Sequence, residues 1–412
     1  MARDDISREA GRLARRLDEL GRISDERGQL TRTFLSPAMG RANARVGGWM
    51  RAERLAVRED TVGNLIGRRE GARRGARTLL LGSHLDTVRD AGRFDGALGV
   101  LLPISALAVL RTRGASLPFA VEVLGFSEEE GVRFASAYLG SKGYCGRLAA
   151  ADLARRDARG ISVREALGRG FVRLRPAHRR SELLGYVETH IEQGPVLEAG
   201  RRPLGVVAAI AGQTRGRIVF RGRAGHAGTT PMGLRRDALA GAAEFILAAE
   251  RLARRSPGLV ATVGTIAVEP GAPNVIPAEA ACSLDLRHPR DPARRRALRR
   301  LLDGARRIAR RRKLGFSWVR TQDDGAVACD ARLTGRLVRS VRKVQGEAPR
   351  LVSGAGHDAV IVSSLAPVAM IFVRCRGGLS HHPDEHARPA DLAAALRALV
   401  HFLESLAADH GR

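Results

Sequence analysis

Long apolar runs, paired cysteines and aromatic residues are all scarce in this chain of 412 residues. The longest nearly unbroken apolar run, 97–110, contains Pro103 and is too short to cross a bilayer, so it predicts a buried helix. The amino terminus lacks the apolar stretch of a secretory signal. The four cysteines are far apart without a Cys-x-x-Cys pair, as expected of reduced thiols: Cys145, Cys282, Cys329 and Cys375. These absences argue against membrane insertion and secretion, and we expect a cytoplasmic protein.

Lysine is almost absent, although the formal net charge is +27. Only three lysines occur: Lys142, Lys313 and Lys343. The basic charge is therefore nearly all arginine, a bias that a GC-rich genome would produce in any soluble protein. The basic runs 294–296, 299–300 and 310–312 are expected on the polar faces of one helix. Because only 4% of residues are aromatic, there is little surface for base stacking, and specific nucleic-acid binding is disfavoured relative to salt-sensitive adsorption.

The order of predicted helices and strands divides the chain into two domains. Helices at 6–20 and 42–54 precede an alternation of strands and helices, which is typical of an α/β domain with a mainly parallel sheet. The order then changes to β-α-β-β-α-β, the split βαβ motif: strand 217–222, helix 236–254, strands 260–268 and 278–287, helix 292–313 and strand 315–320. We expect a first domain formed by 1–212 and 329–412, with 213–328 inserted as a smaller domain.

Polar groups follow two apolar runs that read as strands. His84 follows the run 78–81, and the acidic triplet 128–130 follows the run 119–124. Asp95 lies between them, in a turn flanked by glycine. Because the strands of a doubly wound sheet present ligands at their carboxyl ends, these groups are expected to converge.

These residue types suit a dinuclear hydrolytic centre. Such a centre needs imidazole and carboxylate ligands, a carboxylate that bridges the ions, and a free carboxylate that takes a proton from water. Asp95 is the bridging candidate, while neighbouring glutamates of the triplet can point in different directions, one to a metal and one to the water. Asp86, two residues beyond His84, has the spacing of a carboxylate that fixes the histidine tautomer. Two further histidines, His190 and His381, complete the ligand count.

Together these segments resemble the amidase, hydantoinase and carbamoylase family, which belongs to the aminoacylase-like dinuclear metallopeptidase superfamily. The resemblance runs from about Thr31 to the C-terminal helix. It rests on six segments: Gly82 to Thr87, Phe94-Asp95-Gly96, Glu128 to Gly131, His190 to Pro195, Gly225 to Gly228 and Gly378 to His381.

The resemblance implies two divalent metal ions per subunit. One would be held by His84, Asp95 and His190, and the other by Asp95, Glu130 and His381. Glu129 would be the general base, and Asp86 would also take part in catalysis. His382 directly follows His381, and we choose His381 because the family has its ligand histidine immediately after the serine. Mn²⁺ or Zn²⁺ is expected, with Co²⁺ and Ni²⁺ as further candidates.

The resemblance also implies that the inserted domain is a lid that carries the main contact of a homodimer. His226 would reach the partner subunit's site to polarise the substrate carbonyl. Asn274 and Arg287 would hold the substrate carboxylate. Further substrate contacts are expected from four residues: Gln193, Gln213, Gly356 and His357. Gln213 offers an amide that can pair with a ureido group.

The expected reaction is metal-assisted hydrolysis of the C–N bond in a ureido or N-carbamoyl acid. Three segments, 32–38, 90–96 and 209–215, favour the branch of the family that acts on allantoate. The alternative substrates are N-carbamoyl-L-amino acids. A dipeptidase of the wider superfamily and a non-enzymatic nucleic-acid binder are less favoured.

Overall fold

A computed structural model describes residues 2–172 and 175–410. The chain divides into two compact units: unit 1 is Met1–Ala208 with Cys329–Arg412, and unit 2 is Ala209–Ala328. Unit 2 thus contains the predicted insertion 213–328 together with residues 209–212.

Unit 1 is built on a sheet with the strand order β1-β2-β4-β3-β5-β16-β6, and β15 lies beside β6. The neighbouring strands β4, β3, β5 and β16 are parallel, whereas β1, β2 and β6 pair antiparallel. The strands are β1 (Ala56–Glu59), β2 (Leu65–Arg69), β3 (Thr78–His84), β4 (Ala120–Phe126), β5 (Leu183–Ile191), β6 (Leu204–Ile210), β15 (Arg350–Ser353) and β16 (Val368–Val373). The predicted α/β class with a mainly parallel central sheet is confirmed.

The helices of unit 1 connect these strands. They are α1 (Ala2–Leu20), α2 (Pro37–Ala52), α3 (Ala97–Thr112), α4 (Leu139–Tyr144), α5 (Ala150–Leu153), α6 (Val163–Leu167), α7 (Val196–Ala199), α10 (Ala331–Gln345), α11 (Asp358–Val362) and α12 (Pro389–His410), with 3-10 turns at Arg180–Glu182 and Arg376–Gly378. Helix α3 covers β3, β4 and β5, and α1 and α12 pack against α3. The run 97–110 is therefore a buried helix, as predicted, and it remains helical through Pro103.

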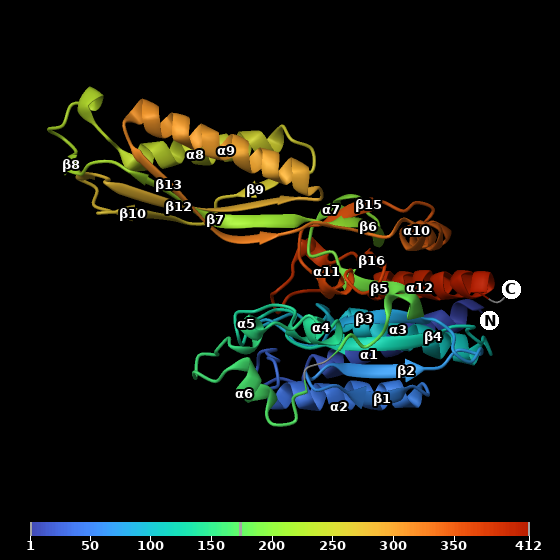
Figure 1. The fold of residues 1–412 in the computed structure, drawn as a ribbon. Helices are drawn as coiled ribbons and strands as arrows, with labels where there is room; N and C mark the ends of the chain where they lie inside the picture. Colours follow the sequence, from blue (N-terminus) through green and yellow to red (C-terminus); the bar gives the residue numbers. More distant parts are fainter. Residues whose placement is uncertain (1, 173–174, 411–412) are drawn as a thin grey trace. The chain divides into compact units, whose positions relative to one another are not determined.

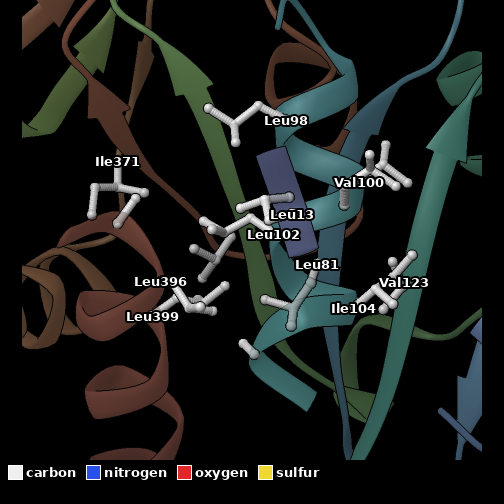
Figure 2. Packing of buried hydrophobic residues seen from close by; sticks show 14 of the residues in the cluster. Leu13, Leu81, Leu98, Val100, Leu102, Ile104, Val123, Ile371, Leu396 and Leu399 are labelled. Atoms are coloured by element: carbon white, nitrogen blue, oxygen red, sulfur yellow. The ribbon is translucent and has the colours of Figure 1, made fainter. Parts of the chain in front are cut away.

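The main hydrophobic core lies between α3 and the central strands (Figure 2). Side chains alternate across each strand, so Leu81 and Val123 face α3, whereas Glu122 faces the opposite side. Leu13 of α1 and Leu399 of α12 close the same core. A sheet buried in this way fixes the strand ends that carry the polar groups.

Unit 2 is a β-α-β-β-α-β arrangement in which one strand is divided into β9 and β10. Its strand order is β10-β12-β7-β13, with β9 also paired to β12. Helices α8 and α9 lie side by side on one face of this sheet (Figure 1). The elements are β7 (Gly212–Arg221), β8 (Gly225–His226), α8 (Ala238–Arg254), β9 (Val260–Thr262), β10 (Ile266–Glu269), β11 (Val275–Ile276), β12 (Glu279–His288), α9 (Asp291–Arg312), β13 (Gly315–Asp324) and β14 (Val327–Ala328), with a 3-10 turn at Met232–Leu234.

One basic side chain of α9 departs from the expected polar face. Arg294 is only 1% exposed, and its guanidinium lies 2.6 Å from Asp323 and 3.0 Å from Asp291. A buried arginine needs such partners because an unpaired charge is costly away from water. The prediction that the run 294–296 is wholly on a solvated face is wrong at its first residue.

None of the helices formed by residues 2–172 and 175–410 is long and apolar enough to cross a membrane.

Candidate active site

Two histidines end neighbouring parallel strands of unit 1 with their rings already oriented. His84 is the last residue of β3, and its Nδ1 lies 2.9 Å from the backbone carbonyl of Asp86. His190 lies near the end of β5, and its Nδ1 lies 2.9 Å from the carbonyl of Ile191. A carbonyl accepts only, so each Nδ1 carries a proton, and Nε2 is the nitrogen that has the lone pair when the ring is neutral. Both rings are therefore in the tautomer that binds a metal through Nε2.

Asp95 presents its two carboxylate oxygens to different histidines. Oδ1 lies 3.4 Å from Nε2 of His84 and 3.0 Å from Nε2 of His190. Oδ2 lies 3.3 Å from Nε2 of His381. Gly96 permits this approach, because a Cβ there would lie about 2.4 Å from the His84 ring. The arrangement suits a carboxylate that is shared between two ions.

The acidic triplet follows β4 at the same edge of the sheet. Glu128 has a positive φ of 53° and turns away from the histidines, with its Oε1 accepting the backbone N–H groups of Arg133 and Phe134. Glu130 turns toward them, with its Oε1 3.4 Å from Nε2 of His381. Glu129 is 8% exposed. The three adjacent glutamates thus have different surroundings, as the sequence predicted for a loop.

Three groups of side chains can each bring ligand atoms within 4.8 Å of one another. They are His84, Asp95 and His190; Asp95, Glu130 and His381; and His84, Glu129 and Glu130. The first two groups contain the same residues as the two predicted ligand sets, and they share Asp95. Imidazole nitrogens with carboxylate oxygens are a donor set that divalent zinc and manganese accept. The residues present therefore fit two divalent ions.

The buried carboxylates and imidazoles of this cluster shift one another's pKa values. Burial alone would raise the pKa of Asp95, but attraction to the nearby imidazoles holds that pKa well below its usual range. Burial would lower the pKa of His84, but contact with Asp95 and the charge of Glu129 raise it well above the usual value. Burial and the charge of Asp95 raise the pKa of Glu130 to about 7. Protonated imidazoles and carboxyls offset the crowded negative charge here, and bound cations would do the same.

The structure distinguishes the two adjacent histidines of the last motif. His381 joins Asp95 and Glu130, and it has a positive φ of 56°, which is unusual for a residue with a side chain. His382 instead accepts the backbone N–H of Asp384 at its Nδ1, 3.1 Å away. The geometry therefore brings His381, and not His382, to the candidate ligands.

Asp86 has a different contact from the one predicted. Its carboxylate lies 3.7 Å from Nδ1 of His84, too far for a hydrogen bond, and the backbone carbonyl of Asp86 makes that contact. The carboxylate accepts the backbone N–H of Glu129 at Oδ1 and that of Glu130 at Oδ2, each at 3.1 Å. The prediction that this carboxylate fixes the His84 tautomer is wrong, because the backbone carbonyl does so. The carboxylate orients the acidic loop instead.

Gln193 and His357 both lie against the ligand cluster. The Gln193 amide nitrogen donates to Oδ2 of Asp95 at 2.8 Å. The His357 ring packs on that of His190, with 4.6 Å between centroids, and its Nε2 lies 2.7 Å from Oγ of Ser353. His357 is only 2% exposed, and its ring supports that of His190.

Gly356, which was also expected to contact substrate, lies directly beside a tyrosine. A Cβ at Gly356 would lie 1.9 Å from the hydroxyl of Tyr138. A side chain at this position would therefore require Tyr138 to move.

Gln213 and Arg287 are cross-strand neighbours on the sheet of unit 2. The guanidinium of Arg287 donates to both oxygens of Asp285, at 2.8 and 2.7 Å. This is the two-bond geometry with which arginine binds a carboxylate. The Gln213 amide donates to Asp324 at 3.0 Å. The structure thus brings these two predicted substrate residues together.

His226 and Asn274 form a second pair. His226 lies in a separate two-stranded ribbon of β8 and β11, Asn274 directly precedes β11, and the backbone N–H of Ala227 donates to the carbonyl of Asn274. Gln213 and Arg221 lie near opposite ends of β7. At roughly 3.3 Å per residue, they are separated by about 25 Å along the strand. Figure 1 shows β8 beyond the Arg221 end.

This separation corrects one prediction. Asn274 and Arg287 of the same chain are too far apart within unit 2 to hold one small carboxylate. Asn274 instead accompanies His226, because it directly precedes β11, the strand that pairs with His226.

Sequence reasoning missed Glu385 as a part of this site. It is 1% exposed, and its Oε1 accepts the backbone N–H groups of Phe94 and Asp95. Its Oε2 lies 2.9 Å from the hydroxyl of Ser380. A glutamate shortly after a histidine is common on surfaces, so its spacing gave no signal of this burial.

Comparison with known proteins identifies the family. Residues 80–405 match the model of the peptidase family M20/M25/M40, and the chain belongs to that family. This family is metal-dependent, in agreement with the candidate ligand groups.

Several relatives within this family have more specific activities in their names. The chain is 42% identical to allantoate deiminase 2 of Glycine max, with 95% of this chain and 88% of the relative covered. It is 39% identical to an N-carbamoyl-L-amino acid amidohydrolase of Geobacillus stearothermophilus, with 96% of this chain and 98% of the relative covered. A solved amidase of the hydantoinase/carbamoylase family from Burkholderia multivorans has a TM-score of 0.90 and 34% identity, with 97% of this chain and 98% of that chain covered. The predicted resemblance is confirmed, and these homologues are amidohydrolases acting on C–N bonds other than peptide bonds.

Proposed function

We propose that this protein is a metal-dependent amidohydrolase that cleaves a ureido C–N bond of allantoate and releases ammonia and CO2. The observation that carries the chemistry is the shared carboxylate of Asp95, whose two oxygens face separate groups of candidate ligands. The support for the substrate is the 42% identity to allantoate deiminases over nearly the whole chain.

Two divalent ions, Mn²⁺ or Zn²⁺, would be held by the two groups that share Asp95. His84, Asp95 and His190 form one group, and Asp95, Glu130 and His381 the other. When bound, such ions lower the pKa of a water molecule and polarise a carbonyl oxygen.

Glu129 would take the proton from the attacking water and deliver it to the leaving ammonia. Its position suits this role because Asp86 holds its backbone N–H, and a Glu129 carboxylate oxygen lies within 4.8 Å of ligand atoms of His84 and Glu130. Its neighbour Glu130 is already in contact with His381, which leaves Glu129 as the carboxylate free to exchange protons.

Unit 2 would act as a lid whose two ends serve different substrate molecules. Arg287 would bind the allantoate carboxylate, and Gln213 beside it would contact a ureido group. Nδ1 of His226 accepts the backbone N–H groups of Gly228 and Thr229, so Nε2 carries the proton and can donate it to a substrate carbonyl.

Because Arg287 lies at one end of the β7–β12 pair and His226 lies in the ribbon beyond the other end, one substrate cannot contact both within a subunit. We therefore propose a homodimer, in which His226 and Asn274 complete the site of the partner subunit. The dimer would act in the cytoplasm, in keeping with four unpaired cysteines.

The competing function is hydrolysis of N-carbamoyl-L-amino acids, which is favoured by relatives at 36–39% identity. Ammonia release should be compared for allantoate, ureidoglycolate and several N-carbamoyl-L-amino acids under matched conditions. We expect the highest kcat/KM with allantoate. A kcat/KM more than about tenfold higher for a carbamoyl amino acid corresponds to about 1.4 kcal/mol in transition-state binding. Such a result would contradict allantoate as the substrate but would leave the proposed metal-dependent hydrolysis unchanged.

A further inference from the structure

Glu385 connects two loops that approach the candidate metal groups from different parts of the chain. Its Oε1 accepts the backbone N–H of Phe94 at 2.8 Å and that of Asp95 at 3.0 Å. Its Oε2 lies 2.9 Å from Oγ of Ser380, the residue before His381. The same hydroxyl lies 2.7 Å from Oδ2 of Asp95. One buried carboxylate therefore joins the Asp95 loop to the His381 loop.

The contact on the Asp95 side satisfies two backbone N–H groups of the loop that precedes helix α3. Phe94 and Asp95 lie before the N-cap Gly96, and both of their N–H groups donate to Oε1 of Glu385. Buried backbone N–H groups need such an acceptor, because leaving them unpaired away from water is costly. Gly92 packs against this carboxylate so closely that a Cβ there would lie 2.4 Å from Oε1. The loop therefore fits around Glu385.

The two candidate metal groups differ in their need for such support. His84 and His190 belong to central strands, and each ring is oriented by a nearby backbone carbonyl. His381 lies outside the helices and strands, its side chain is 48% exposed, and its φ is positive. Its place relative to Asp95 depends on the link through Ser380 and Glu385.

We propose that Glu385 is a positioning residue that sets the affinity of the ion held by Asp95, Glu130 and His381, with a smaller effect on the ion held by His84, Asp95 and His190, whose two histidines are fixed by central strands. This inference rests on the proposed two-ion centre. It concerns metal retention and needs no assumption about the substrate.

The test uses the full-length protein loaded with Zn²⁺ and dialysed against a graded series of chelator-buffered zinc concentrations. Zinc per subunit is then measured by mass spectrometry of the metal. We expect Glu385→Ala to weaken retention of one ion by about ten- to a hundredfold, the usual effect of losing a group that orients a metal ligand. Retention of the second ion should weaken less, because His84 and His190 stay fixed by their strands. His381→Ala should likewise weaken one ion more than the other.

Two variants separate positioning from general destabilisation. Glu385→Gln should remain close to wild type, because its amide oxygen can still accept both N–H groups and its amide nitrogen can donate to Ser380. Asp330→Ala removes the side chain that caps α10 through the N–H of Leu333, and should keep both ions despite a lower melting temperature.

Retention of both ions by Glu385→Ala at wild-type affinity would overturn the proposal. So would equal weakening of both ions, or a Glu385→Gln variant as defective as Glu385→Ala. Wild-type protein that binds no zinc would contradict the metal centre itself, and with it this role for Glu385.

Discussion

The carboxylate of Asp86 holds the backbone of Glu129, with Oδ1 accepting its N–H at 3.1 Å. The other oxygen accepts the N–H of Glu130 at the same distance. One buried side chain thus aligns both the proposed base and a proposed metal ligand, although it belongs to the loop that follows His84.

Asp86→Ala should therefore impair two properties together. Two N–H groups would lose their acceptor, so we expect a turnover lowered by at least about tenfold and weaker retention of the ion near Glu130. Asp86→Asn keeps one acceptor oxygen and should be less affected. Metal analysis and ammonia release from the same preparations check this, and wild-type values for Asp86→Ala would refute the role.

The variants Glu129→Gln and Glu130→Gln should distinguish the proposed general base from the proposed metal ligand. Glu129→Gln should keep its metal while lowering turnover by at least about a hundredfold, the lower range for loss of a general base. Glu130→Gln should lose metal, because an amide is a weaker ligand than a carboxylate. If Glu129→Gln empties the site and Glu130→Gln does not, the two roles are reversed.

Mixed dimers test whether His226 and Arg287 of one chain serve different active sites. His226→Ala and Arg287→Ala should each be poorly active but should recover activity when combined, because a hybrid contains one site with both residues intact. Asn274→Ala should also complement Arg287→Ala. It should not complement His226→Ala, since both of these residues serve the same site.

The readout is ammonia release from heterodimers purified with two different tags. A hybrid of Asn274→Ala and Arg287→Ala that stays inactive would show that these residues serve one site despite their distance on the sheet.

The sequence could predict those parts of the site that follow directly from strands. His84 and the acidic triplet come after apolar runs, and parallel strands bring their carboxyl ends to one edge. The resemblance added His190 and His381, which no local pattern distinguishes from ordinary histidines.

Contacts that depend on the fold could not be predicted. Glu385 is 290 residues from Asp95 in sequence, and no spacing rule connects them. The separation of Asn274 from Arg287 follows from the registers of β7, β12 and the β8 ribbon, which their motifs do not specify. Arg294 looks like its exposed neighbours in an arginine-rich helix until Asp291 and Asp323 are seen beside it.

A buried carboxylate away from the site gives a prediction about pH. Glu122 accepts hydrogen bonds from Arg68 at 2.9 Å and Tyr144 at 2.7 Å, and lies 3.1 Å from His178. Burial alone would raise the pKa of Glu122, but the contacts with His178, Tyr144 and Arg68 lower it to about 2. Since the folded pKa is below the unfolded one, its contribution to stability is full above the unfolded value and is lost as the pH falls toward 2.

Glu122→Gln should consequently lower the free energy of unfolding by up to about 3 kcal/mol at pH 7. The difference from wild type should shrink to about half by pH 3. Urea unfolding of both proteins at several pH values measures this, and a difference independent of pH would show that the charge of Glu122 contributes nothing.

Metal dependence of allantoate hydrolysis is the most direct test of the account. Ammonia release should be followed before chelation, after complete removal of metal, and after addition of Mn²⁺ or Zn²⁺, with metal content measured at each stage. We predict loss of activity on removal and recovery as the ions return toward two per subunit, because five candidate ligands converge on two groups that share Asp95. Full activity in protein verified to be free of metal would contradict the account.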